Sequence, residues 1–260
     1  MKKITFATAM VAGCLSQVSY ADFFGIYAGA SIWQATPSGQ VQDIGVGIQF
    51  NTSIDVENDL GFGEENTNMF YLAFEHPIPL LPNLRAQHTE LIATTSAQLS
   101  RDITFAGIDY QVDSQVSAIA DLTHTDGTIY WELWDLIAEV DLGITGRLFD
   151  GLVEISSDTS INNNGGVSLR GFREFSAGIP LVYGKVGVKV PFTGLSASVS
   201  ANAINLPDVE LMDIMARINY EVDFGLGAEV GYRLMELDIV DDIVADISVE
   251  GFYAGISYHF

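Results

Sequence analysis

The sequence predicts an all-β protein: a transmembrane, antiparallel up-and-down β-barrel of about ten strands. Three observations predict this fold. An export signal opens the chain, segments of alternating apolar and polar residues fill most of the remaining sequence, and the last residue, Phe260, is aromatic. A strand crosses a bilayer in roughly 9–11 residues that face lipid and lumen in turn, so alternation over that length is its signature. No segment approaches the run of about eighteen apolar residues that a membrane-spanning helix requires.

Residues 1–21 have the layout of a signal peptide, with two lysines, a short apolar segment and small residues before the expected cleavage point. Cleavage between Ala21 and Asp22 leaves residues 22–260 as one barrel domain with long extracellular loops. The alternative is a lipoprotein signal in which Cys14 is acylated. Because Cys14 is the only cysteine, ordinary cleavage leaves a chain that can form neither a disulfide nor a cysteine-based metal site.

The chain is strongly acidic, with a formal net charge of −23 that becomes more negative when the two lysines of the signal are removed. Such a charge argues against nucleic acid as a partner, because its phosphates would be repelled. The simpler interpretation is that acidic loops keep the surface solvated. The alternative is that divalent cations bridge the protein to phosphorylated lipopolysaccharide.

Ten segments alternate with period two and are predicted to be wall strands. In the second, for example, Phe70, Leu72 and Phe74 alternate with Tyr71 and Ala73. The third alternates poorly, and its faces cannot be assigned. The first four strands cover residues 24–34, 67–76, 84–98 and 122–133.

The remaining six strands alternate more cleanly. Val186, Val188 and Val190 lie on one face of the sixth strand, and Lys185 and Lys189 lie on the other. These six strands cover residues 139–148, 182–190, 195–202, 213–220, 226–235 and 252–260.

The connections give independent support, since short turns at one rim and longer loops at the other are typical of an outer-membrane barrel. Short connections follow the even-numbered strands, at 76–83, 134–137, 191–194 and 221–225. Longer ones follow the odd-numbered strands, at 35–66, 99–121, 149–181, 203–210 and 238–245. Twelve strands would result if 44–50 with 53–56, and 152–156 with 167–175, formed additional membrane hairpins. We interpret these segments as strand extensions above the membrane.

Charged residues in the strands are expected to face the lumen, because burying Arg or Lys on the lipid face costs roughly 2–4 kcal/mol at the midplane. Ten strands are close to the number at which side chains fill a barrel, so we expect charges of both signs to pair and fill the interior. A narrow path for small solutes is the alternative, and a wide pore is excluded. The predicted lumen charge network consists of Glu75, Asp126, Glu132, Glu139, Asp141, Arg147, Lys185, Lys189, Asp213, Arg217, Glu229 and Arg233.

Enzymatic interpretations find little support. His124 and Asp126 share a face near the outer end of the fourth strand, where the acidic 238–245 segment could join them in a protease-like site. A His-x-Asp pair on a polar strand face is more often a lumen hydrogen bond, and no Gly-x-Ser-x-Gly motif is present. We therefore predict no enzyme, no catalytic residue and no cofactor.

A calcium site is a further alternative, because four aspartates could supply hard oxygen ligands. They lack the glycine spacing of a dedicated calcium loop, so we predict a solvated acidic loop and no metal. The four are Asp238, Asp241, Asp242 and Asp246.

Four segments together resemble an uncharacterised family of proteobacterial outer-membrane β-barrel proteins named for a Gly-Gly feature. They are Glu75–Asn83 (EHPIPLLPN), Ile179–Lys185, Gly231–Arg233 and Gly251–Phe260, and they span most of the mature chain. Gly165-Gly166 is the only Gly-Gly pair. The resemblance implies the fold and a place in the outer membrane of a Gram-negative bacterium. It brings no established activity or catalytic residue.

The C-terminal strand also predicts partners. Tyr258 and Phe260 resemble the C-terminal signal that the barrel-assembly machinery reads, and periplasmic chaperones are expected during biogenesis. Outer-membrane lipid and lipopolysaccharide are expected to surround the finished barrel, which we predict to be a monomer. Its predicted role is structural or one of surface interaction.

Overall fold

The computed structural model describes residues 24–43, 52–78, 80–160, 166–240 and 243–260, and its regular elements are β-strands. Within these residues no helix is long and apolar enough to cross a membrane. The predicted signal peptide, with the Ala21–Asp22 cleavage point, lies outside the described residues. The strands are β1 (Gly25–Asp43), β2 (Ile54–Asp55), β3 (Glu65–Glu75), β4 (Asn83–Glu90), β5 (Ile92–Gln98), β6 (Ile103–Phe105), β7 (Ile108–Tyr110), β8 (Gln115–Asp121), β9 (His124–Asp135), β10 (Ala138–Ser160), β11 (Gly166–Val190), β12 (Leu195–Leu206), β13 (Val209–Glu221), β14 (Leu226–Val240) and β15 (Ile243–His259).

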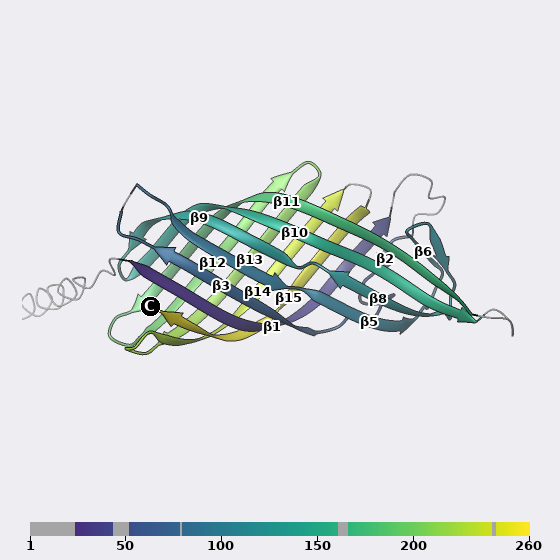
Figure 1. Ribbon diagram of the computed structural model, residues 1–260, viewed down its shortest axis with the longest axis horizontal. Helices are drawn as coiled ribbons and strands as arrows, with labels where there is room; N and C mark the ends of the chain where they lie inside the picture. The colour runs from purple at the N-terminus through teal and green to yellow at the C-terminus, as the bar shows by residue number, and fades with distance from the viewer. Residues whose placement is uncertain (1–23, 44–51, 79, 161–165, 241–242) are drawn as a thin grey trace, which may run out of the picture.

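The strands form one closed antiparallel barrel (Figure 1). β1 pairs with β15 on one side and β3 on the other, and β10 pairs with β11, so the wall closes on itself. Two wall strands are interrupted: β4 and β5 follow each other along one of them, and β8 and β9 along the next. Counted in this way the wall has ten strands, which confirms the prediction.

The twelve-strand alternative is wrong. Residues 152–156 and 167–175 pair with each other inside β10 and β11, as continuous extensions of two wall strands. The other proposed hairpin combined 44–50 with 53–56. Residues 44–50 lie outside the described residues, and 53–56 contains the short β2, which pairs with the upper end of β1.

The barrel has two zones along its axis, and the lower zone is the end that holds Phe260. Here each of the ten wall strands carries exposed apolar side chains on its outer face. This apolar belt is the outer surface of a barrel built for lipid. One residue from each strand illustrates it: Ile32, Leu72, Leu84, Ile129, Ile144, Val186, Val199, Ile218, Val230 and Phe252.

In the upper zone the polarity of the two faces reverses. Along β10 the inward residues change from Arg147 to Phe149 and Ile155, while the outward residues change from the exposed Leu148 to the exposed Asp150. Buried apolar side chains then fill the interior, as in a water-soluble protein. This upper core includes Trp33, Ile54, Leu60, Phe62, Leu91, Leu99, Ile103, Phe105, Tyr110, Val116, Ile155, Met235 and Val249.

The reversal explains why the third predicted strand could not be assigned. Odd-numbered residues point inward throughout β4 and β5. In the lower half these are polar, such as Arg85 and Gln87. In the upper half they are mostly apolar, with Ala93 and Ala97 in β5 and Leu91 between the two strands. The side-chain period is therefore regular, but the chemistry of each face changes near Glu90.

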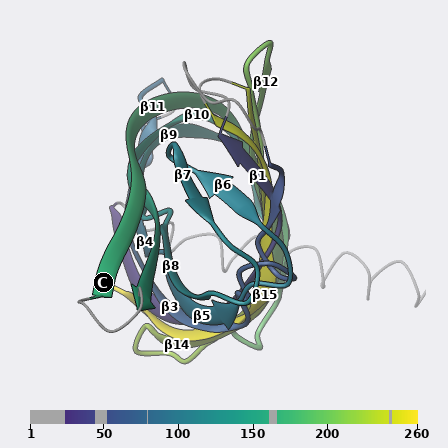
Figure 2. The ribbon, with the colours of Figure 1, turned by 90° about the vertical axis from the view of Figure 1, so that its right-hand side faces the viewer.

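A hairpin lies inside the upper zone. Figure 2 shows β6 and β7 within the ring of wall strands, where Ile103, Phe105 and Tyr110 are buried in the upper core. The Tyr110 hydroxyl accepts a hydrogen bond from the Gly171 amide (2.9 Å) and donates one to the Ile155 carbonyl (2.6 Å). It thus stands between two residues that face each other across β10 and β11. The 99–121 segment, predicted as a loop, instead supplies this hairpin and the wall strand β8.

At the base of the hairpin, Arg101 pairs with Asp59. The Arg101 guanidinium lowers the pKa of the Asp59 carboxyl through this hydrogen-bonded contact. Because Asp59 lies in the turn that follows β2, the ion pair connects the hairpin to a second segment that enters the upper core through Leu60 and Phe62.

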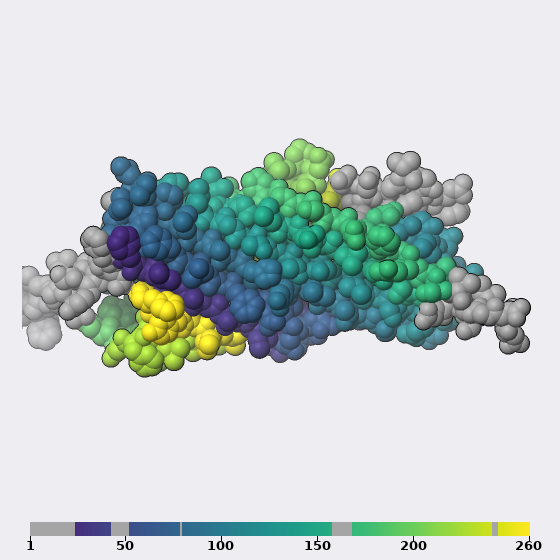
Figure 3. All heavy atoms as spheres, viewed as in Figure 1, coloured from purple at the N-terminus to yellow at the C-terminus, as the bar shows by residue number. Residues whose placement is uncertain are grey.

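The lower rim carries short turns, as predicted, and it joins the two ends of the described chain. The Phe260 amide donates to the Ile26 carbonyl at 2.9 Å. The molecule is longer than it is wide (Figure 3). β10 and β11 extend furthest toward the upper end, away from Phe260 (Figure 1).

Candidate functional site in the lumen

The centre of the lumen holds a buried layer of two arginines and two aspartates, here called the arginine layer. Arg147 on β10 forms two hydrogen bonds to Asp126 on the neighbouring β9, at 2.8 and 2.7 Å. It also reaches Asp213 on β13 at 2.5 Å. Arg233 on β14 binds the same Asp213 at 2.9 and 2.6 Å. The layer therefore connects strands on different sides of the barrel.

The remaining contacts of Arg233 complete the layer. Its guanidinium donates to the Thr89 hydroxyl on β4 at 3.0 Å and lies 4.8 Å from the ring centre of Trp33 on β1. Both Arg147 and Arg233 are 0% exposed. Buried charges of this kind require partners on every side, because desolvation of a lone guanidinium would cost several kcal/mol.

His124 lies next to the arginine layer, and its hydrogen bonds determine which ring nitrogen carries the proton. Its Nε2 lies 3.0 Å from Nη2 of Arg233, and its Nδ1 lies 2.8 Å from the Leu122 carbonyl. An arginine can only donate and a carbonyl can only accept. The proton is therefore on Nδ1, and the ring is a neutral acceptor at Nε2.

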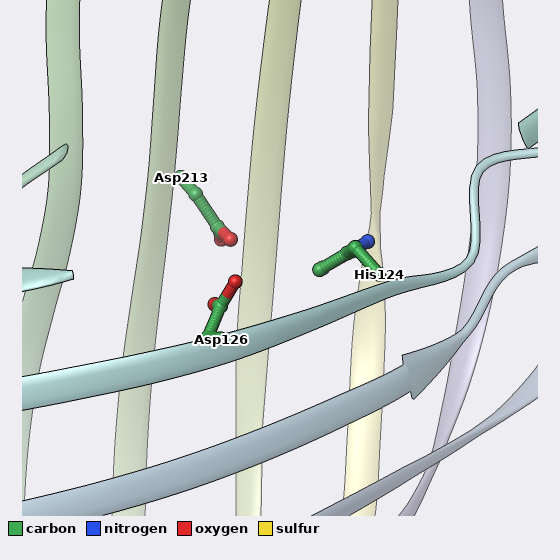
Figure 4. A group of neighbouring side chains, drawn as sticks. All are labelled: His124, Asp126 and Asp213. Atoms are coloured by element: carbon green, nitrogen blue, oxygen red, sulfur yellow. The ribbon is translucent and has the colours of Figure 1, made fainter. Parts of the chain in front are cut away.

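The side chains of His124, Asp126 and Asp213 come within 4.8 Å of one another, a spacing at which three ligands could hold a metal ion (Figure 4). These three side chains do not fit a metal cation. Both carboxylates already bind guanidinium groups, and Nε2 of His124 faces an N–H group of Arg233. Two buried positive charges would repel a divalent ion at this point. The arrangement is that of an ion-pair layer.

The same geometry bears on the protease-like hypothesis. His124 is 2% exposed and packs against Phe149, so it is enclosed in the lumen instead of standing at an exposed rim. Asp126 turns its carboxylate to Arg147. Asp238 lies on the exposed outer face of β14, and Asp241 and Asp242 are outside the described residues. The structure thus places Asp238 on the opposite face of the wall from His124, and arginine contacts already occupy both His124 and Asp126.

Below the arginine layer, a cavity of about 380 Å³ extends toward the lower rim, here called the vestibule. Lys185 lies 3.0 Å from Glu139 and 3.4 Å from Asp141. Lys189 lies 2.7 Å from Asp135 and 2.9 Å from Glu139. Seven residues of the predicted network line it: Glu75, Glu132, Glu139, Asp141, Lys185, Lys189 and Arg217.

Arg217, which lines the vestibule, forms an ion pair with Glu229. Their closest atoms are 3.4 Å apart, and Glu229 accepts a 2.5 Å hydrogen bond from Ser31. With the four residues of the arginine layer, all twelve predicted network residues are thereby placed. The structure pairs Arg147, Lys185, Lys189, Arg217 and Arg233 with carboxylates.

Sequence reasoning missed several members of the site. Arg85 went unnoticed because it belongs to the strand whose faces could not be assigned. Asp135 was counted as part of a turn. The alternation of the strands did place Tyr71, Tyr130 and Tyr183 on the inner face, and all three line the vestibule.

These features define the class of protein: an antiparallel ten-stranded barrel with an apolar belt and a lumen that contains many charged side chains. No protein-family model matches the chain, and no curated protein matches it. Membership of the Gly-Gly family therefore stays a prediction. Gly165 also lies outside the described residues.

Similar solved structures are bacterial outer-membrane barrels. The outer-membrane protease OmpT of Escherichia coli is 11% identical, with 91% of this chain and 97% of that chain covered and a TM-score of 0.49. The β domain of the Bordetella autotransporter BrkA is 14% identical over 91% and 99%, with a TM-score of 0.38. An outer-membrane channel of Pseudomonas putida F1 is 10% identical over 92% and 97%, with a TM-score of 0.34. At these identities no activity passes from any of them to this chain.

Proposed function

We propose that the chain is an integral outer-membrane barrel with a closed lumen, and that its role is structural or one of surface interaction. The observation that carries this proposal is the arginine layer, whose two arginines are 0% exposed. The upper core lies directly above it. A conducting barrel needs a continuous aqueous path, and charged side chains that line such a path would be in contact with water.

The proposed location is the outer membrane of a Gram-negative bacterium, with the lower rim in the periplasm. The apolar belt supports placement in lipid. The short lower turns and the position of Phe260 support the orientation. Tyr258 and Phe260 lie on the outer face with their ring centres 4.5 Å apart, where the barrel-assembly machinery could read them.

The proposed surroundings are outer-membrane lipid and lipopolysaccharide. On the outer wall of the upper zone, the strand register aligns Glu210, Asp238 and Asp246 across three neighbouring strands. Divalent cations could bridge such carboxylates to phosphorylated lipid. The wall closes within one chain, which supports a monomer.

Conductance of the purified, folded protein in planar bilayers tests the closed lumen. We expect no reproducible open steps from the wild-type protein. Reproducible steps would contradict the proposal and support a narrow solute channel instead. A variant with Arg147→Ser and Arg233→Ser serves as a comparison, because it removes both cations of the arginine layer.

A further inference from the structure

The vestibule contains charged groups that the lumen network leaves unpaired. Six acidic and four basic side chains line it. Lys185, Lys189 and Arg217 each have a carboxylate within 4.0 Å. In the described part of the chain, Arg85, Glu75 and Glu132 have no opposite charge within that distance.

Arg85 is held in position by neutral groups. Its Nη2 donates to Gln87 at 2.9 Å, and its guanidinium lies 4.6 Å from the ring centre of Tyr71. Arg217 lies 5.0 Å from the same ring. A guanidinium carries five N–H groups. The contacts of Arg85 leave most of them available to a ligand in the cavity.

The carboxylate of Glu75 is oriented in a similar way, by a 2.7 Å hydrogen bond from the Tyr130 hydroxyl. Tyr130 faces Asn83 in the strand register, and Arg85 lies two residues further along the strand of Asn83. Two strand residues span roughly 7 Å, and their side chains share a face. The unpaired guanidinium and the unpaired carboxylates therefore line the same cavity at neighbouring levels.

We propose that the vestibule binds a small zwitterion, namely an α-amino acid or a very short peptide. The ligand carboxylate pairs with Arg85, and the ligand ammonium pairs with Glu75 and Glu132. A zwitterion supplies a partner to both unpaired signs. A simple anion would meet an excess of carboxylates, and a metal ion would meet the Arg85 guanidinium. The volume of about 380 Å³ is large enough to admit a ligand of this class.

The proposed site does not depend on whether the lumen conducts, because the cavity lies below the arginine layer and opens toward the lower rim. Gly194 and Glu221, next to the turns of that rim, are among its lining residues. The ligand would thus come from the compartment at the lower rim, which in the proposed orientation is the periplasm.

Isothermal titration calorimetry of the folded protein in detergent micelles tests the proposal with three probes: L-alanine, acetate and methylammonium. We expect L-alanine to bind at least tenfold more tightly than either single-charge probe. Arg85→Gln and Glu132→Gln should each weaken L-alanine binding at least tenfold. Arg170→Gln is the matched control, since Arg170 pairs with Glu154 in the upper zone, and it should bind as the wild type does.

Absence of L-alanine binding to the wild type would overturn the proposal, and so would acetate binding as tight as L-alanine binding. Wild-type affinity in Arg85→Gln or Glu132→Gln would also overturn it. Heat-modifiable migration on a gel checks that each variant is folded. If Arg85→Gln does not fold, Arg85→Lys and Glu132→Gln decide, because the lysine variant retains the charge but loses the two-pronged contact with a carboxylate.

Discussion

At the scale of single residues, Asp213 joins both arginines of the lumen layer. It accepts hydrogen bonds from both Arg147 and Arg233, and it shares the compensation of Arg147 with Asp126. Removal of one partner from a buried ion pair typically costs about 3–5 kcal/mol, because the other charge is left uncompensated. Substitution of Asp213 is therefore the most direct test of whether the arginine layer stabilises the barrel.

We predict that Asp213→Asn lowers the free energy of unfolding by about 3–5 kcal/mol. Urea unfolding of the protein refolded into lipid vesicles measures it. Asp150→Asn is the control, since Asp150 is exposed on the outer face of β10, and it should change stability by less than about 0.5 kcal/mol. Equal effects of the two substitutions would show that the layer contributes little.

A second residue-scale prediction concerns the outer wall. Burial, together with the neighbouring carboxylates of Asp246 and Glu210, raises the pKa of Asp238 above its ordinary value. An acid whose pKa is higher in the folded state destabilises the fold above that pKa. The penalty disappears as the pH falls toward the ordinary aspartate value of about 3.9.

We therefore expect Asp238→Asn to raise the thermal unfolding temperature at pH 7, with a gain that shrinks as the pH is lowered to about 4. Thermal unfolding followed by circular dichroism across this pH range measures the difference. Asp223→Asn, in an exposed turn of the lower rim, is the control for removal of one surface carboxylate. A gain that grows toward low pH would contradict the assigned direction of the pKa shift.

At the scale of elements, one hydroxyl of the β6–β7 hairpin is hydrogen-bonded to two wall strands. Tyr110 fills the gap between the Gly171 amide and the Ile155 carbonyl. A side chain on Gly171 would interfere with this contact, because a Cβ there would lie 2.9 Å from the Phe105 carbonyl oxygen and 3.0 Å from the Tyr110 hydroxyl. The glycine thus allows the hairpin to approach the wall closely.

We predict that Tyr110→Phe destabilises the hairpin by about 1–3 kcal/mol, because it leaves two buried backbone groups without partners. Hydrogen exchange at residues 103–110 and 171 should accelerate, while exchange in β12 and β13 stays unchanged. Tyr232→Phe is the control, since Tyr232 is on the outer face. Unchanged exchange at the hairpin would show that packing alone holds it in place.

The elements also show how far the sequence could be interpreted. Strands such as β11 and β15 were predicted well in the lower zone, because lipid outside and charge inside impose strict alternation. The β4–β5 strand was not, because the polarity of its faces reverses near Glu90. Arg85 was missed for the same reason. The β6–β7 hairpin is too short to produce a periodic pattern, and nothing local indicates that it folds inward.

At the scale of the whole molecule, the proposed orientation puts the lower rim in the periplasm and the upper zone outside the cell. The mature chain predicted from the sequence has no cysteine, so single cysteines can report orientation. Ser176 lies on the exposed outer face of β11 in the upper zone, and Thr193 lies in an exposed turn of the lower rim.

We expect a membrane-impermeant maleimide to label Ser176→Cys in intact cells, and Thr193→Cys only after the outer membrane is permeabilised. Densitometry of labelled bands from the two variants measures this. Labelling of Thr193→Cys in intact cells, with Ser176→Cys protected, would reverse the proposed orientation.

The reversal of polarity between the zones has a thermodynamic consequence. When the barrel forms in lipid, the apolar side chains of the belt are in contact with hydrocarbon both before and after folding. The side chains of the upper core move from water into an apolar interior. Only the second process carries the large positive heat-capacity change of unfolding that apolar hydration produces. The curvature of stability with temperature should therefore come mainly from the upper core, and cooling should weaken that end of the molecule before it affects the belt.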